Sequence, residues 1–136
     1  MDNRLADWRP RLQAWLSATA GLPYRPGTHD CILFAGGARG AMTGTDPMAG
    51  WAGRYATIEE GLALARAHGC EDPFAHVVAG LEEVPVAYAQ VGDIAALEGV
   101  DGRPGLGIVI GERIATVGLR GRELAPLMSA LRVWRV

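Results

Sequence analysis

The chain has 136 residues, of which 13 are basic and 15 acidic, giving a formal net charge of −2. This length predicts one domain with a buried core, spanning residues 1–136. The charge gives no electrostatic reason to expect nucleic-acid binding. No apolar run approaches the roughly 20 residues that are needed to cross a bilayer. We therefore expect neither nucleic acid nor a membrane among the partners.

The N-terminal segment is mixed in charge and lacks the apolar core of a secretion signal, so we expect the protein to be made in the cytoplasm. Beyond this segment, Asp7 is expected to cap a helix that tolerates Pro10 in its first turn. One face of the helix carries residues at helical spacing: Trp8, Leu12, Trp15, Leu16 and Thr19. Gly21-Leu22-Pro23 should end the helix.

Residues 24–37 begin with residues that favour a turn and continue into a segment that can form an apolar helix. Pro26 and Gly27 disfavour a helix, whereas the residues from Cys31 onward can begin one that Asp30 would cap. A thiol in the first turn faces the positive end of the helix dipole and unpaired N–H groups, so the pKa of Cys31 is expected to fall. The alternative is that Cys31 is a small buried hydrophobe, which is the usual role of a free cysteine.

His29 is the nearest candidate base for this thiol. Residues i and i+2 of an extended segment project to the same side, roughly 6–7 Å apart, so His29 could reach the sulfur of Cys31. The simpler interpretation is a loop histidine that only satisfies a local hydrogen bond. The residues alone leave both roles open.

A second helix is expected over about residues 30–42. It contains Gly36, Gly37 and Gly40, each of which costs up to about 1 kcal/mol relative to alanine. A helix keeps glycine where a neighbour must approach closely. We therefore expect a sheet to pack across this small-residue face.

Between this helix and residue 83 the sequence predicts an irregular loop and two shorter helices. Two aromatic residues are expected to pin the loop: Trp51 and Tyr55. A capping box of Thr57 and Glu60 predicts a third helix that ends near His68-Gly69. Asp72-Pro73 is expected to begin a short fourth helix.

After residue 83 the pattern changes to short apolar runs. They cover residues 94–97, 106–110, 113–117 and 131–136. Their short connections, with a hairpin signal at Gly111-Glu112, indicate antiparallel strands and leave no room for crossover helices. One more helical turn is expected over residues 126–130. A mainly helical half (1–83) followed by an antiparallel sheet half (84–136) predicts an α+β fold with the cysteine-bearing helix packed on the C-terminal sheet.

Two cysteines, Cys31 and Cys70, are too few to indicate a disulfide framework. No Cys-x-x-Cys, His-x-x-x-His or carboxylate cluster indicates a metal site, so we expect neither a metal nor a cofactor. Five arginines gather in the C-terminal third: Arg113, Arg120, Arg122, Arg132 and Arg135. A solvated face explains them more simply than an anionic partner.

Two segments of the chain, near residues 24–31 and 92–111, carry motifs that resemble those of a known family. Tyr24 and Gly27 precede Asp30-Cys31 at a helix start, Gly92-Asp93 leads into the first core run, and residues 105–111 read Gly-Leu-Gly-Ile-Val-Ile-Gly. In these residues the chain resembles the NlpC-type cell-wall cysteine peptidases, a bacterial and phage branch of the papain-like fold. The resemblance implies a papain-like fold with a catalytic-type cysteine. The helices in between resemble a compact phage-associated subgroup usually found near tail genes.

The resemblance also implies which residues form the candidate site and which catalytic residue of the family is missing from it. It makes Cys31, Asp30 and Tyr24 site residues, with His29 as a further candidate. Where the family places its catalytic histidine this sequence has Gly105, and no histidine follows His76. Loss of a general acid–base normally costs on the order of 10²–10⁴ in rate. The resemblance therefore implies a non-hydrolytic relative that contacts phage tail proteins, made in the cytoplasm and carried in the virion tail after assembly.

Two alternatives stay open. In the first, His29 serves as a rearranged base and the protein is a cysteine peptidase or amidase that acts on peptidoglycan peptides through Cys31. In the second, the resemblance is accidental and the chain is an unrelated α+β binding protein.

Overall fold

The computed structural model describes residues 3–99 and 104–136 and confirms the expected α+β fold. Within these residues the helices are α1 (Trp8–Thr19), α2 (Cys31–Thr43), α3 (Ile58–Ala67) and α4 (Pro73–Val77). The strands are β1 (Glu82–Val84), β2 (Ile94–Glu98), β3 (Pro104–Val109), β4 (Arg113–Gly118), β5 (Gly121–Pro126) and β6 (Arg132–Arg135). The 3₁₀ turns η1 (Val86–Tyr88) and η3 (Leu127–Ser129) precede β2 and β6. None of the described helices is long and apolar enough to cross a membrane.

Three of the four described helices begin at a capping side chain, as the sequence predicts. The caps are Asp30 for α2, Thr57 for α3 and Asp72 for α4, and each accepts a hydrogen bond from a backbone N–H of the first turn. The expected cap at Asp7 is wrong, because this side chain makes no such bond. Its backbone, at φ −101° and ψ 29°, lies outside the extended region from which a side chain reaches the first turn.

The glycines of α2 do face close neighbours, but these neighbours are not the sheet. A Cβ atom at Gly37 would lie 2.2 Å from the ring of Trp15, and one at Gly40 would lie 2.7 Å from the side chain of Asp46. The small-residue face therefore packs against α1 and the loop after α2. The expectation that the sheet covers this face is wrong, since the larger side chains of α2 contact the strands instead.

The six described strands form one antiparallel sheet in the order β1-β6-β2-β3-β4-β5. Four of them match the predicted apolar runs, and η3 matches the predicted turn after residue 126. The sequence analysis missed the two edge strands, β1 and β5, because both are mostly exposed and carry charged residues instead of an apolar run. Residues 100–103 belong to the predicted connection between β2 and β3 and lie outside the described part of the chain.

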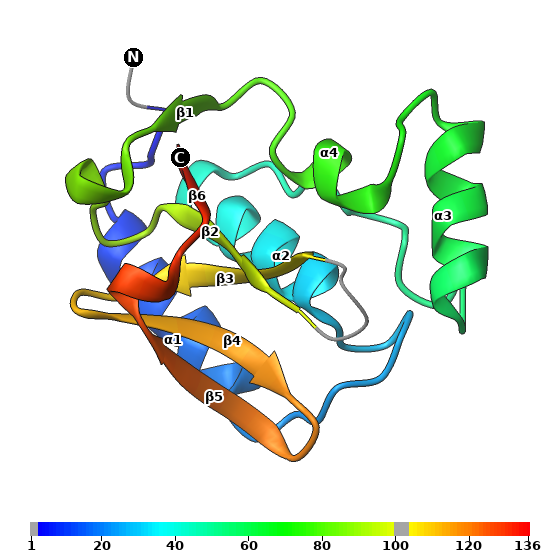
Figure 1. Cartoon of the computed structure of the whole chain (residues 1–136), viewed down its shortest axis with the longest axis horizontal. Helices are drawn as coiled ribbons and strands as arrows, with labels where there is room; N and C mark the ends of the chain where they lie inside the picture. Colours follow the sequence, from blue (N-terminus) through cyan, green and yellow to red (C-terminus); the bar gives the residue numbers. More distant parts are fainter. Residues whose placement is uncertain (1–2, 100–103) are drawn as a thin grey trace.

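The sheet separates two apolar clusters of unequal size. Helices α1 and α2 lie behind the sheet in Figure 1, with α2 in contact with β3 and β4. The larger cluster fills this interface and includes Phe34, Met42, Ile94, Leu106 and Ile108. A smaller cluster on the opposite face contains Ala95, Leu97, Val109, Ile114 and Val133, and residues of η1 and η3 pack against it. The smaller cluster lies on the face turned away from the cysteine-bearing helix.

A buried carboxylate joins the two ends of the chain. The Asp93 side chain is fully buried, and its oxygens lie 3.1 Å from guanidinium nitrogens of both Arg4 and Arg135. Arg4 also donates to the backbone carbonyl of Val136. The predicted arginine cluster is thus divided among separate partners, since Arg135 pairs with Asp93 while Arg122 bonds to α1.

We expect Asp93→Asn to lower the free energy of unfolding by about 3–5 kcal/mol, because it removes the charge from a buried ion pair. Urea unfolding followed by circular dichroism measures this change. The control is Glu83→Gln, which weakens the exposed pair between Glu83 and Arg132 and should leave the midpoint almost unchanged. Equal effects of the two substitutions would contradict a central role for Asp93.

Candidate functional site

The candidate site is built around the carboxylate of Asp30, at the start of α2. This side chain is only 5% exposed. One oxygen accepts the backbone N–H of Leu33, and the other accepts the N–H of Gly27 and the hydroxyl of Tyr55. Donors from three different segments therefore satisfy a buried charge that would otherwise be costly.

Gly27 allows the turn before α2 to approach the loop that carries Tyr55. Its φ angle is +80°, and a Cβ atom at this position would lie 1.6 Å from the carbonyl oxygen of Tyr55. A side chain here would push the two segments apart. The glycine of the Tyr-x-x-Gly motif is thus required by a close backbone contact as well as by its conformation.

Tyr24, Asp30 and Cys31 are brought to the same place. Burial is the main cause that raises the pKa of Tyr55, followed by its hydrogen bond to Asp30 and the charge of Asp30, and interactions with Cys31 and Tyr24 raise it further. Tyr24 is half-buried, and its backbone N–H donates to the carbonyl of Gly118 at the end of β4. Three of the four residues predicted for the site therefore influence Tyr55, and one of them, Asp30, bonds to it.

The thiol of Cys31 lies at the interface between α2 and β3, and the expected fall in its pKa is wrong. Burial raises the pKa of Cys31 to about 11, and the negative charge of Asp30 acts in the same direction. The backbone N–H groups of Leu106, Cys31 and Ile32 do favour the thiolate, as expected at a helix start, but their effect is smaller than that of desolvation. Near neutral pH the group is therefore a protonated thiol.

The candidate base, His29, packs against helix α2. It is buried, with its ring edge-on to Phe34 at a centroid distance of 6.1 Å. Burial lowers its pKa, Asp30 opposes this, and Arg122, which lies over Phe34, lowers it further. Among the described residues no hydrogen bond joins His29 to Cys31. The residue between them, Asp30, is extended at φ −129° and ψ 176°, and α2 begins at Cys31 itself.

Position 105 also faces a different side of the sheet from the one expected. Strand pairing places Gly105 opposite Leu97, a member of the smaller cluster on the outer face, whereas its neighbour Leu106 belongs to the larger cluster beside α2. Side chains alternate along a strand, so a side chain at position 105 would project away from Cys31. The expectation of an empty histidine position facing the thiol is wrong, although the backbone of this segment does contact the sulfur.

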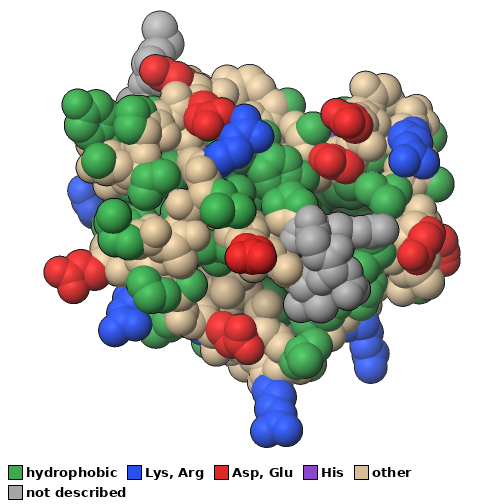
Figure 2. All heavy atoms as spheres, viewed as in Figure 1, with side chains coloured by type: hydrophobic (Ala, Val, Ile, Leu, Met, Phe, Trp, Pro, Cys, Tyr) green, Lys and Arg blue, Asp and Glu red, His purple; other side chains and the backbone are tan. Residues whose placement is uncertain are grey.

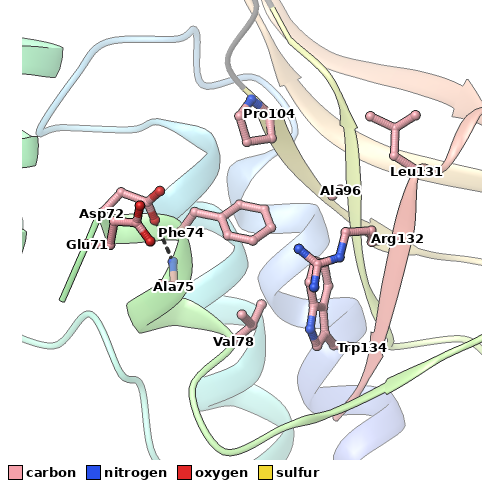
Figure 3. Close-up of a pocket in the computed structure, with 10 residues that line it drawn as sticks. All are labelled: Glu71, Asp72, Phe74, Ala75, Val78, Ala96, Pro104, Leu131, Arg132 and Trp134. Carbon is pink, nitrogen blue, oxygen red and sulfur yellow. Dashed lines mark hydrogen bonds between the residues drawn. The ribbon is translucent and has the colours of Figure 1, made fainter.

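A surface hollow of about 440 Å³ lies between α4 and the strands β2 and β6. In Figure 3 the rings of Phe74 and Trp134 form its apolar wall, while Glu71 and Asp72 lie at one side and Arg132 extends along Trp134. The residues that line this hollow do not include Tyr24, His29, Asp30 or Cys31. The sequence-predicted site residues are therefore packed within the fold instead of lining this hollow.

No cluster of three or more metal-ligating side chains occurs among residues 3–99 and 104–136. The sequence analysis assigned Tyr55 only to pinning a loop, which its 7% exposure confirms, but missed its bond to Asp30. No sequence signal links these two residues, which lie 25 positions apart. The contact from the Leu106 backbone is likewise invisible to an analysis based on side-chain types.

These features define an α+β protein with an antiparallel sheet and a desolvated cysteine at the capped start of its central helix. The chain belongs to the family described as a domain of unknown function (DUF6950), whose family model matches residues 3–136. The match covers both the helical part and the sheet, so the family corresponds to this whole fold. No curated protein matches the chain.

We expect Cys31 to react slowly with iodoacetamide at neutral pH, since a pKa of about 11 leaves about 0.1% of the thiol ionised at pH 8. The rate should keep rising as the pH is increased toward 11. Mass spectrometry of the Cys70→Ser variant isolates this reaction from that of the second cysteine. A rate that reaches half its maximum below pH 8 would show that the thiol is activated.

Tyr55→Phe should destabilise the protein by about 1.5–3 kcal/mol, because it removes one hydrogen-bond donor from a buried carboxylate. Chemical unfolding measures this loss. The matched control is Tyr88→Phe, which removes the same hydroxyl from a residue that is 68% exposed and should change stability little. If both variants unfold at the same denaturant concentration as the parent protein, the bond to Asp30 does not support the fold.

Proposed function

We propose that this protein is a component of a phage or prophage tail module that has an NlpC-like fold and acts in tail assembly or at the tail tip through protein contacts, without hydrolysis. The observation that carries the non-hydrolytic part is the environment of Cys31. Its thiol has a raised pKa, and no imidazole bonds to it among the described residues.

Peptide hydrolysis by a cysteine requires two proton transfers. A base must remove the thiol proton, and the same group must then protonate the leaving amine. The groups that influence the pKa of Cys31 are backbone N–H donors and the Asp30 carboxylate. Backbone amides neither accept nor release a proton at neutral pH, and the carboxylate is already bonded to three donors. This arrangement supports a cysteine that is kept for packing.

The alternative is a peptidoglycan peptidase or amidase in which His29 acts as the base for Cys31. His29 does lie close enough to Asp30 for that charge to affect its pKa. However, it packs against Phe34 and is influenced by Arg122, which bonds to α1, whereas the sulfur contacts β3. Because no hydrogen bond joins His29 to Cys31 among the described residues, we favour the non-hydrolytic proposal.

An apolar outer surface, which we define by Tyr88, Met128 and Leu131, supports an action through protein contacts. These side chains are 68%, 83% and 61% exposed, and they come from η1, η3 and the residue before β6. Figure 2 shows exposed hydrophobic side chains interspersed with polar and charged ones over the face that is viewed in Figure 1. Exposed apolar patches are typical of protein interaction sites.

The assignment to a tail rests on the resemblance of two segments, residues 24–34 and 92–111, to NlpC-type proteins of phages. The resemblance depends on a helix that starts after a capping Asp30 and on a strand that follows Asp93, and the structure contains both elements. Under this proposal the protein is made in the cytoplasm and then incorporated into the virion tail.

To test the non-hydrolytic part, purified protein is incubated with peptidoglycan and with isolated stem peptides, and the products are analysed by mass spectrometry. We expect no cleavage above the buffer control, and the Cys31→Ala variant should behave like the parent protein. Cleavage that Cys31→Ala abolishes would overturn this part of the proposal and favour the hydrolase.

To test the contact part, the protein is co-expressed with the tail proteins of the phage or prophage that encodes it, and stable complexes are purified. The double substitution Tyr88→Asp with Met128→Asp should weaken the complex about tenfold or more, because it places charge on the apolar outer surface. The control is Leu119→Asp, which changes a side chain that is 79% exposed in the turn between β4 and β5. Failure to bind any of these tail proteins would contradict the proposal.

A further inference from the structure

The second cysteine has the imidazole contact that Cys31 lacks. Cys70 lies in the connection between α3 and α4, and its Sγ atom is 3.3 Å from Nδ1 of His76 in α4. The other ring nitrogen of His76, Nε2, lies 2.8 Å from the backbone carbonyl oxygen of Pro47. The imidazole therefore lies between the thiol and a backbone acceptor, and the thiol also lies 4.0 Å from the backbone carbonyl oxygen of His68.

The carbonyl of Pro47 determines which nitrogen of His76 carries the proton. A carbonyl oxygen can only accept a hydrogen bond, so Nε2 must be the donor. In the neutral ring Nδ1 is then unprotonated and faces the thiol as an acceptor. This is the tautomer that a base for Cys70 requires.

Packing holds the imidazole in this orientation. The ring of His76 stacks on Trp51, with a centroid distance of 5.0 Å and an interplanar angle of 28°. Trp51 is only 3% exposed and also contacts the ring of His68. Cys70 is half-buried, as is Cys31, and both pack against the larger cluster, so the two thiols differ in the imidazole partner of Cys70.

We propose that Cys70 is a reactive thiol with His76 as its base, and that it undergoes reversible exchange with low-molecular-weight disulfides. The thiol proton passes to Nδ1 of His76, and the thiolate attacks one sulfur of the disulfide. A sulfur–sulfur bond forms to Cys70 while the original disulfide bond breaks. The departing thiolate takes the proton from Nδ1, so protons and electrons balance without another reactant.

Geometry distinguishes this site from Cys31. The sulfur of Cys31 contacts backbone N–H groups at the interface between α2 and β3, and these groups cannot act as a base. Cys70 has a base on one side and is followed by Glu71, which is exposed. The two cysteines of one chain therefore provide an internal comparison for the test.

The test exposes the full-length protein to oxidised glutathione at neutral pH, stops the reaction with acid at timed intervals, and locates the mixed disulfides by peptide mass mapping. Cys70 should be modified at least about tenfold faster than Cys31. His76→Gln is the informative variant, because its amide nitrogen can still donate to the Pro47 carbonyl while the base is lost. It should slow modification of Cys70 about tenfold or more.

Two controls separate the chemistry from structural damage. His68→Gln changes a neighbouring imidazole that bonds to the carbonyl of Leu64 and not to the sulfur, so it should leave the rate within about twofold. Near pH 10 hydroxide ionises a free thiol without help, so His76→Gln should approach the parent rate there. The parent protein and the His76→Gln variant share the other titratable groups of this connection, including Glu71 and Asp72. These groups therefore cannot cause a difference between the two rates.

Histidine nitrogen NMR gives an independent readout, since His76 should appear with its proton on Nε2. Equal and slow modification of Cys70 and Cys31 would overturn the proposal. So would an unchanged rate in a folded His76→Gln variant. If that variant does not fold, a His76 tautomer protonated on Nδ1 in the parent protein would overturn it equally.

Discussion

The burial of one carboxylate, that of Asp30, determines how the centre of this protein is arranged. Donors from the preceding turn, from the first turn of α2 and from the loop that carries Tyr55 all bond to it. Removing any one of them leaves part of a buried charge uncompensated, so the three segments are fixed relative to one another. The position of Cys31 follows from this arrangement, because it is the next residue in the chain.

The same carboxylate limits what Cys31 can do chemically. A helix start normally favours a thiolate through its N–H groups, and those groups do contact the sulfur here. However, the interface with β3 removes water from the thiol, and the negative charge of Asp30 lies beside it. Desolvation and like charge both oppose ionisation, and together they outweigh the helix start. A cap that fixes a cysteine in place can therefore also keep it protonated.

Local signals in the sequence predicted much of the fold but little of the site. The start of α2, with Asp30 as its cap, and the strand after Asp93 follow from hydrophobic pattern and capping chemistry, which act over a few residues. The edge strand β5 was missed because an exposed strand needs no apolar run. The bond from Tyr55 to Asp30 and the direction of Gly105 depend on tertiary packing and strand register, which no short pattern encodes.

The two cysteines show why position within a helix is a weaker guide to thiol chemistry than the partner of the sulfur. Cys31 occupies the position that typically activates a thiol, yet burial there opposes the charge that activation requires. Cys70 lies in an ordinary connection, yet the fold brings His76 to its sulfur and a carbonyl orients the ring. Because desolvation and hydrogen-bond partners both arise from tertiary contacts, a motif indicates where a thiol lies, and its surroundings determine whether it reacts.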